Sequence, residues 1–503
     1  MLPTCLTLAF LFCGVTVFRR LYAHPLSAFK GPRLAAITRW YQGYYDIIKH
    51  GGLLRQVNYL HELYGPVVRI GPNELSFRDA TAFSDIYNAG SKFTKDPSFY
   101  QCFALPLSSF GTIDPHRSRS RREMLNPLFS RRAILRLESV VQNKVDHLIS
   151  RLLSESGGVT PINLFMAFRC ASLEIITVYC LNQSPNALDT PGFKHPFIAS
   201  IQAAIPMFWI LKYIPALTVL LMDPPKWLSN GLFPRFQGFF DMRQQVASQL
   251  DDVLVGRNQL GTTDHPIIYN YLLDPSKDLK PLTPLTRTEL YQEALALLIA
   301  GSDTLGNTCN IGFFNVLNQP SILRKLTAEL KEAWPDQDHP VGLVTLEKLS
   351  YLTAVIKESL RLAHGTVSAM PRVVGPSDAI IGGVAVPAGT VVSASHTYVH
   401  LDPEIFPDPS EFIPERWLAQ SDETKHLESW LVSFSKGPRM CLGINLAWCE
   451  LYLIFGNLFR KLDLQPYNAT LEDFQTYDAF FVPIHCGKDL HVIVNRKNEW
   501  EDK

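Results

Sequence analysis

The sequence predicts a mainly α-helical fold with small β-sheets, organised as a single large domain. Apolar residues recur at helical spacing over 288–317, 346–362 and 442–462, whereas strand-like segments such as 66–77 and 379–395 are short and bounded by turn residues. No internal repeat and no low-complexity linker divides the 503 residues. We therefore expect residues 23–503 to form one globular domain behind a short N-terminal segment.

The composition is that of a folded protein with a substantial core. Hydrophobic residues make up 47% and charged residues 19% of the chain, and Lys plus Arg and Asp plus Glu both number 47. A net charge of zero argues against general binding of nucleic acid, which requires a basic excess. Nine cysteines without a C-x-x-C pair argue against a zinc cluster or a disulfide framework, and so favour a reducing compartment.

The N-terminal segment, residues 1–22, is predicted to anchor the protein in a membrane. Residues 2–18 contain no charged side chain, and this length is at the short end of what spans a bilayer as a helix. Arg19 and Arg20 follow directly and favour a cytosolic location for everything after them. The alternative, a cleaved signal peptide, would require a basic start and a small-residue cleavage site, and the segment has neither.

A second apolar stretch, 197–222, is also long enough for a membrane span. It contains Pro206, Lys212 and Pro215, which do not suit a regular spanning helix. We interpret it as a lid that touches the substrate or the membrane, with ordinary protein core as the alternative.

The segment with the clearest chemistry is 434–443, which reads F-S-K-G-P-R-M-C-L-G and precedes an apolar helix. Cys441 is placed where a helix begins, and amide groups and the positive end of a helix stabilise a thiolate there. Gly437 and Gly443 allow the backbone to bend and to approach a flat ligand closely. Arg439 can pair with a carboxylate of that ligand, and Phe434 can shield the sulfur from water.

This segment resembles the haem-binding loop of the cytochromes P-450, and other landmarks of that family follow the expected order along the chain. The resemblance implies the cytochrome P-450 fold, a haem b whose iron is bound by Cys441, and monooxygenase activity. A thiolate ligand donates electron density to the iron and favours cleavage of the O–O bond of dioxygen.

The stretch Ala300-Gly301-Ser302-Asp303-Thr304 lies inside the helix predicted over 288–317. Ala300 and Thr304 share a helix face, and the threonine hydroxyl can bond to the carbonyl four residues earlier. Gly301 removes a side chain at the same place, although in isolation this pattern more often reflects packing. The stretch resembles the oxygen-activating helix of the family, which implies that Asp303 and Thr304 supply a proton relay.

The sequence Glu358-Ser-Leu-Arg361 lies late in the helix predicted over 346–362. Most such pairs contribute little at a surface. Here the pair resembles the E-x-x-R element of the family, and the later segment Pro414-Glu-Arg416-Trp matches its third member, Arg416. The resemblance implies a structural role for this trio and no catalytic one.

Two further arginines are candidates for contacts with the haem propionates, both through the resemblance. Arg372 follows the E-x-x-R helix, after the small residues 365–369 that would line an apolar substrate pocket. The basic run 117–122 resembles the haem-side helix of the family, where basic residues also face an electron donor. The tryptophan or histidine usual in that helix is absent, and His116 is displaced from its position, so we select Arg119.

His396 and His400 are four residues apart, a spacing that metal ligands can use. The intervening residues contain no acid in the position that a metalloprotease requires. We interpret both histidines as ordinary parts of the fold.

The leading hypothesis is a monooxygenase that inserts one oxygen atom of dioxygen into a hydrophobic small molecule. No nucleotide-binding glycine motif is visible, so NADPH electrons would come through a separate reductase that carries FAD and FMN, with cytochrome b5 as a further donor. Segments such as Tyr64-Gly-Pro-Val-Val-Arg-Ile resemble those of fungal cytochromes P-450 that act in secondary metabolism, including terpenoid biosynthesis. The implied location is the endoplasmic reticulum membrane, with the catalytic domain in the cytosol.

Three alternatives remain open. The substrate could be a polyketide or another metabolite. The protein could be a haem-thiolate isomerase or dehydratase that needs no reductase, or a haem-bearing membrane sensor. The pair of Asp303 and Thr304 argues against the isomerase, because chemistry without dioxygen has no use for a proton relay.

Overall fold

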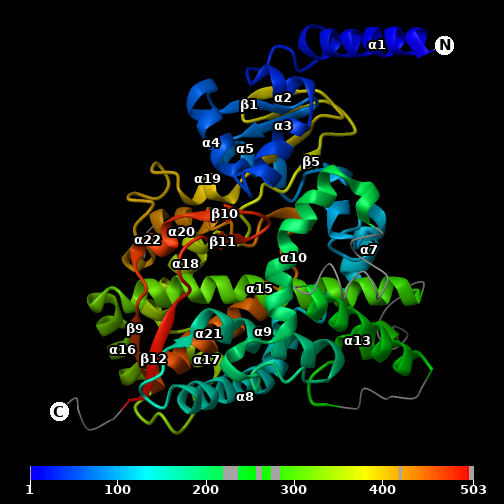
Figure 1. Ribbon diagram of the computed structural model, residues 1–503. Helices are drawn as coiled ribbons and strands as arrows, with labels where there is room; N and C mark the ends of the chain where they lie inside the picture. Colours follow the sequence, from blue (N-terminus) through cyan, green and yellow to red (C-terminus); the bar gives the residue numbers. More distant parts are fainter. Residues whose placement is uncertain (1, 219–235, 256–262, 274–283, 419–421, 498–503) are drawn as a thin grey trace.

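The computed structural model describes residues 2–218, 236–255, 263–273, 284–418 and 422–497. Long helices form the larger part of the body, and a smaller part at one side carries a mixed sheet and the N-terminal helices (Figure 1). The mainly helical class predicted from the sequence is confirmed. The helical part contains α7 (Pro115–Leu125), α8 (Arg131–Ser156), α9 (Leu164–Leu181), α10 (Pro196–Tyr213), α13 (Gln237–Leu254), α14 (Ile268–Leu273), α15 (Arg287–Leu317), α16 (Pro320–Ala333), α17 (Leu343–Leu346), α18 (Ser350–Ala363), α20 (Asp422–Ser429), α21 (Ile444–Lys461) and α22 (Leu471–Gln475).

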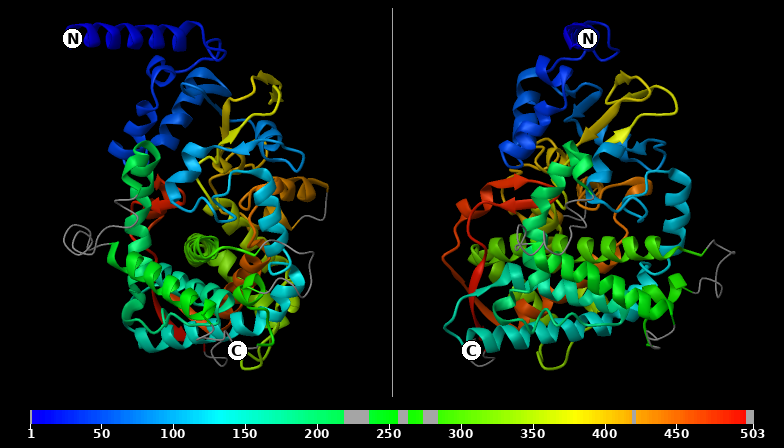
Figure 2. Two further views of the ribbon diagram at one scale, coloured as in Figure 1. Left: turned by 90° about the vertical axis from the view of Figure 1, so that its right-hand side faces the viewer. Right: turned by 45° about the vertical axis from the view of Figure 1, so that its right-hand side comes forward.

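Helix α15 runs through the centre of the helical part and is seen nearly end-on in the left view of Figure 2. It begins at a capping box in which Thr286 and Glu289 bond reciprocally, one residue before the predicted start. A methyl group on Gly306 would lie 2.5 Å from Cγ of Arg169, and one on Gly312 would lie 2.3 Å from Oγ of Ser359. These glycines therefore allow α9 and α18 to pack directly against α15.

The helix predicted over 346–362 is interrupted in the structure. Helix α17 ends at Leu346, Leu349 has an extended backbone, and α18 begins at Ser350. Leu346 and Leu349 are nevertheless buried. The apolar pattern therefore predicts the buried residues correctly on both sides of the break, although the helix is not continuous. The helix predicted over 442–462 is α21, which begins two residues later because Gly443 is its N-cap.

The main sheet has five strands in the order β1-β2-β8-β5-β3. The hairpin predicted over 66–77 is present as antiparallel β1 and β2, and the strand pairs predicted over 379–395 are the β6–β7 hairpin and β8, which runs parallel to β2. A three-stranded sheet β4-β12-β9 and a hairpin β10-β11 lie nearer the C-terminus. The strand bounds are β1 (Val67–Gly71), β2 (Glu74–Phe77), β3 (Thr94–Lys95), β4 (Ile162–Asn163), β5 (Arg372–Val373), β6 (Ala379–Ile381), β7 (Val384–Val386), β8 (Val391–Ala394), β9 (Leu462–Tyr467), β10 (Tyr477–Ala479), β11 (Pro483–His485) and β12 (His491–Arg496).

The N-terminal helix α1 (Leu2–Tyr22) lies outside the folded body (Figure 1). Its segment Thr4–Tyr22 is long and apolar enough to cross a membrane, and none of it is buried. Helix α9 passes the same test but is 94% buried, as expected of a core helix. Short helices connect α1 to the body and follow the strands: α2 (Arg33–Ile37), α3 (Trp40–Gly43), the π-helix η1 (Tyr44–Ile48), α4 (Leu53–Tyr64), α5 (Ala80–Tyr87), α6 (Pro97–Tyr100) and α19 (His396–His400), with 3-10 turns η2 (Gln101–Phe103), η3 (Pro191–Phe193), η4 (Pro215–Leu217), η7 (Pro414–Trp417) and η8 (Gly437–Arg439).

The second apolar stretch forms α10 and the turn η4. Most apolar side chains of α10, including Phe197 and Trp209, are buried against the rest of the protein, although Pro206 lies within the helix. The final part of the predicted lid, 219–222, lies outside the described residues. Helix α10 is thus a wall of the body, and contact with a membrane stays a prediction.

Candidate active site

Cys441 lies in a loop that is fixed from both sides. Its backbone amide donates to the carbonyl of Phe434 across 2.8 Å. Gly437 has a φ of 73°, and a Cβ there would lie 2.3 Å from the carbonyl oxygen of Tyr87. Only glycine fits this position. Gly443, in contrast, meets no other part of the described protein within 4 Å of an added Cβ, which leaves its surface free for a ligand.

The thiol of Cys441 faces a cavity deep inside the protein. Burial raises its pKa, whereas the amide of Gly443 and the charge of Arg122 lower it. Cys441 is exposed at the wall of this cavity, whereas the protein around the cavity supplies the burial that raises the pKa of its thiol. The amide of Gly443 and the charge of Arg122 therefore stabilise a thiolate in this position, and a bound metal cation would stabilise it further.

Helix α15 forms the opposite wall of this cavity. Ala300, Gly301 and Thr304 all line it together with Cys441, as the sequence predicts. The Thr304 hydroxyl donates to the carbonyl of Ala300 across 3.0 Å, which is the bond expected from their spacing. A Cβ on Gly301 would lie 2.9 Å from Cγ1 of Ile176, so packing against α9 also requires this glycine.

Asp303 does not line the cavity. It is buried on another face of α15 and forms an ion pair with Arg169 of α9. Consecutive residues of a helix point about 100° apart, so Asp303 and Thr304 do not face the same space. The predicted relay therefore lacks its acid at the cavity wall, and any contribution of Asp303 must pass through other groups.

The acid that does line the cavity is Glu450 of α21, which sequence reasoning missed. Its carboxylate accepts a hydrogen bond of 2.7 Å from the hydroxyl of Ser172 on α9. Burial raises the pKa of Glu450 to about 8, and the Ser172 bond opposes this effect only in part. An acidic residue between Cys449 and Leu451 in an apolar helix was the available signal.

Several cations gather on one side of the cavity. Lys95, Arg122 and Arg439 line it, and buried Arg372 lies close enough to lower the pKa of both Lys95 and Arg439. Burial is the larger cause for both groups and helps to bring the pKa of Arg439 to about 10. In the described part of the chain, no carboxylate forms an ion pair with any of these four residues.

Such a group of cations is costly unless an anion compensates it. Nη1 of Arg439 is buried without a hydrogen-bond partner in the described protein, and so is Nε2 of His396, which lines the same cavity. The arrangement suits a flat ligand with two carboxylates at one edge. The residues therefore fit a haem in three respects: Cys441 lies on one wall of the cavity, α15 forms the opposite wall, and the cations lie along one edge.

The structure favours Arg122 in place of Arg119 as a propionate contact. Both belong to α7, but only Arg122 lines the cavity of Cys441. Arg119 is exposed and lies with His116 on a neighbouring cavity of about 750 Å³, which Arg122, Arg372 and Arg439 also line. A basic run on a helix does not determine which of its residues faces the protein interior, because that depends on how the helix packs.

Glu358, Arg361 and Arg416 are brought together as the sequence predicts. The Glu358 carboxylate accepts from Arg361 across 2.7 and 2.9 Å and from Arg416 across 3.1 Å. It also accepts from Nε1 of Trp417 and from the amide of Ile413, each at 2.9 Å. These buried bonds join α18 to η7 and lie outside the cavity, which suits a structural role.

His400 is occupied within the fold. Its Nε2 accepts from the amide of Val432 across 3.0 Å, and burial is the main reason why its pKa is well below the usual value. His396 lies four residues earlier at the cavity wall. The two histidine side chains therefore lie in different environments.

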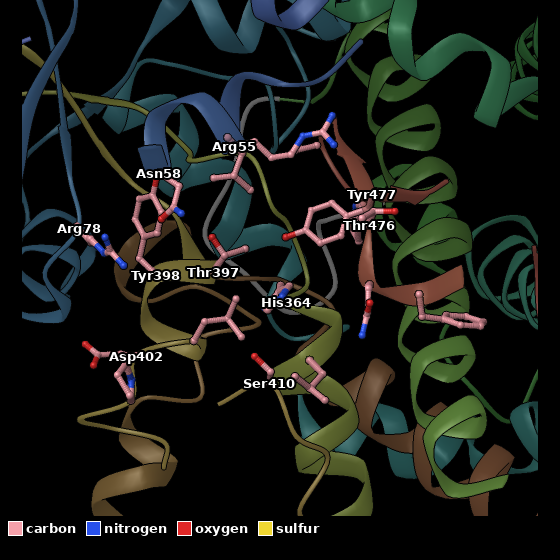
Figure 3. A pocket seen from close by; sticks show the side chains of 18 of the residues that line it. Arg55, Asn58, Arg78, His364, Thr397, Tyr398, Asp402, Ser410, Thr476 and Tyr477 are labelled. Carbon is pink, nitrogen blue, oxygen red and sulfur yellow. The ribbon is translucent and has the colours of Figure 1, made fainter. Parts of the chain in front are cut away.

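A second cavity, of about 900 Å³, lies between α4, α19 and the β10–β11 hairpin (Figure 3). Its wall includes Arg55, Asn58, His364, Tyr398 and Tyr477, and it shares no lining residue with the cavity of Cys441. It contains no cysteine in the described protein. We therefore place the active site at Cys441.

A thiol at the wall of an internal cavity, an opposing helix with a threonine bond and a group of cations without carboxylate partners define a haem-thiolate protein. The family model of cytochrome P450 matches residues 36–484. The chain therefore belongs to the cytochrome P450 family. It is a monooxygenase of that family, which uses haem iron and receives NADPH electrons through a separate reductase.

Similar proteins come from fungi. The chain is 35% identical to cytochrome P450 monooxygenase MO6277 of Ascocoryne sarcoides, over 94% of each chain. It is 33% identical to tryptophan 6-hydroxylase fscE of Fusarium equiseti, over 96% of this chain and 95% of the relative. It is 34% identical to conidiogenone synthase PchP450 of Penicillium rubens, over 96% and 97%. These relatives are fungal enzymes of secondary metabolism.

Proposed function

We propose that the protein inserts one oxygen atom of dioxygen into an apolar small molecule of terpenoid type. The observation that carries this proposal is that Cys441 and the face of α15 with Ala300 and Thr304 border one buried cavity. The wall around them is largely apolar and includes Phe110, Ile176, Leu297, Met370 and Phe481. Such a wall favours a hydrocarbon skeleton over a charged substrate.

The residues of the chain have distinct roles in this proposal. Bound haem would activate dioxygen through its iron. Cys441 would bind the iron, with Phe434 shielding the sulfur and the Gly443 amide stabilising its negative charge. Thr304 would orient protons on the α15 side of the cavity, opposite Cys441. The small residues Ala300 and Gly301 would leave space there for dioxygen. Arg122, Arg372 and Arg439 would hold the propionates.

We also propose the cellular setting. Residues 1–22 would anchor the protein in the endoplasmic reticulum membrane, and residues 23–503 would lie in the cytosol. The exposed apolar helix α1 and the arginines at its C-terminal end support this orientation. The electron donor would be an NADPH–cytochrome P450 reductase with FAD and FMN, assisted by cytochrome b5.

The relatives include one whose name states a hydroxylation of tryptophan, so a second substrate class needs a test. Purified enzyme would be incubated with reductase, NADPH and ¹⁸O₂ against terpenoid hydrocarbons, polyketides and tryptophan. We expect ¹⁸O in a terpenoid product only. Conversion that continues without dioxygen or reductase would instead support the isomerase alternative.

The ligand assignment has its own test. Cys441→Ala should abolish the thiolate-type absorbance of the reduced, carbon-monoxide-bound protein. Cys449→Ala, which removes a buried thiol from the same region, should leave it unchanged. A spectrum that persists in Cys441→Ala would contradict the assignment.

A further inference from the structure

The second cavity, between α4, α19 and the β10–β11 hairpin, has a buried histidine on its wall (Figure 3). His364 is 5% exposed, and burial is the main reason why its pKa is lowered to about 3. Its neighbour His400 has a pKa well below the usual value for the same reason. Both rings are therefore neutral at physiological pH, and each carries a proton on one of its two nitrogens.

The backbone determines which nitrogen of His400 carries the proton. Its Nε2 accepts from the amide of Val432 across 3.0 Å, so the proton lies on Nδ1. Nδ1 of His400 lies 3.5 Å from Nδ1 of His364, which must therefore be the unprotonated nitrogen of that ring. The proton of His364 then lies on Nε2. This N–H group has no hydrogen-bond partner among the described residues, and they do not bury it completely.

A tyrosine on the adjoining hairpin provides a second group without a partner. Tyr477 of β10 lines the same cavity, and its ring centroid is 6.4 Å from that of His364. Burial raises the pKa of Tyr477, so the hydroxyl keeps its proton and can donate. This hydroxyl forms no hydrogen bond with the part of the chain that the structure describes. The two side chains thus offer two unused donors to a ligand in the cavity.

The charges around the second cavity favour neither an anion nor a cation. Both signs are present on its wall: Arg55, Arg78, Asp79, Asp402 and Glu404. Arg55 also lies 3.6 Å from the carboxylate of Asp478. Apolar side chains supply much of the remaining wall: Leu54, Ile311, Phe314, Leu362, Leu471 and Phe474. An apolar wall with a few neutral donors suits a neutral small molecule, and the volume of about 900 Å³ leaves room for one.

We propose that the second cavity binds a neutral, largely apolar molecule whose hydroxyl or carbonyl oxygen accepts from Nε2 of His364 and from the hydroxyl of Tyr477. A hydrocarbon substrate offers no such acceptor, whereas every product of oxygen insertion has one. The oxygenated product of this enzyme therefore belongs to the chemical class that the cavity selects. The link to the product rests on the proposed function, and the binding site itself does not.

The second cavity is separate from the cavity of Cys441, because the two share no lining residue. A ligand in one cavity therefore leaves the other one accessible. The proposed ligand should bind while the cavity of Cys441 is occupied, and this property distinguishes it from a molecule that simply enters the active site.

The test measures the binding of radiolabelled cedrol, a rigid terpenoid alcohol, to full-length holoenzyme by equilibrium dialysis with the same detergent on both sides. Saturating clotrimazole, whose azole nitrogen binds the haem iron, occupies the cavity of Cys441. We expect cedrol to bind at a single site under these conditions. Cedrene, a hydrocarbon of the same skeleton, should compete about tenfold more weakly, because it leaves both donors without a partner.

Three variants place the bound cedrol in the second cavity. Tyr477→Phe keeps the ring and should weaken cedrol binding about three- to tenfold, because one hydrogen bond is lost. Thr476→Trp fills the cavity from an exposed position on its wall and should abolish the binding. Tyr467→Phe removes a hydroxyl from an exposed tyrosine of β9 outside the cavity and should change nothing. All three should keep the clotrimazole-induced absorbance change, which reports that they fold and hold the haem.

Three results would overturn the site: no cedrol bound beside clotrimazole, equal affinity for cedrol and cedrene, or undiminished binding in Thr476→Trp. The product isolated from turnover, tested in the same way, identifies the source of the ligand. Tighter binding than that of cedrol assigns the site to the product, and weaker binding assigns it to another oxygenated metabolite.

The haem assignment is tested separately in the same samples. A wild-type protein without any clotrimazole-induced absorbance change would contradict the proposed function. Cedrol binding to the wild type and to Thr476→Trp, compared without clotrimazole, would then still report on the second cavity, because neither His364 nor Tyr477 lines the cavity of Cys441.

Discussion

Glu450 should make the stability of this protein depend on pH in a direction that its burial determines. The side chain is 3% exposed, and its carboxylate accepts a hydrogen bond from the hydroxyl of Ser172. No cation forms an ion pair with it in the described part of the chain. Burial therefore favours the neutral acid and raises the pKa from 4.5 to about 8.

The magnitude follows from the linkage between protonation and folding. The folded protein holds this proton more tightly than the unfolded chain, so the contribution is complete below pH 4.5 and is lost as pH rises to about 8. The change between these limits corresponds to at most about 5 kcal/mol in the free energy of unfolding. Glu450→Gln should remove it, because the amide is neutral at every pH and keeps an oxygen for Ser172.

The assay is urea denaturation of wild type and Glu450→Gln at pH 5, 6.5 and 8.5, with the haem content of both proteins matched. At pH 5 the two should agree within about 1 kcal/mol, and at pH 8.5 the variant should be more stable by a few kcal/mol. Glu347→Gln, at a partly exposed site, should follow the wild-type profile. Parallel profiles for wild type and Glu450→Gln would refute the argument from burial.

Three further predictions concern the site and its support. Glu358→Gln should lower the free energy of unfolding by about 3–5 kcal/mol, measured by urea denaturation, because two buried arginines lose their charge partner; a loss below about 1 kcal/mol would contradict this role. Arg122→Gln should weaken haem retention about tenfold in transfer to apomyoglobin, whereas Arg119→Gln should change it less than about twofold; the opposite order would restore Arg119 as the propionate contact. Thr304→Ala should keep the haem but increase the peroxide formed per NADPH consumed; unchanged coupling would remove Thr304 from the mechanism.

The sequence by itself determined the parts of the site that depend on local geometry. The ten-residue frame around Cys441 predicts a bent loop ahead of a helix, and the structure places α21 there, with Gly437 at the positive φ of 73° that the bend requires. The spacing of Ala300 and Thr304 puts them on one face of α15 wherever that helix lies. Both inferences need only covalent geometry and helical periodicity.

Only the tertiary structure decided which face of each helix meets the cavity. Asp303 follows the packing of α9 and pairs with Arg169, and Arg122 faces inward although Arg119 carries the same charge. Glu450 becomes a cavity acid because α21 packs beside α9. Periodicity shows which residues share a face, but the neighbour that each face meets is set by close packing between segments far apart in the chain.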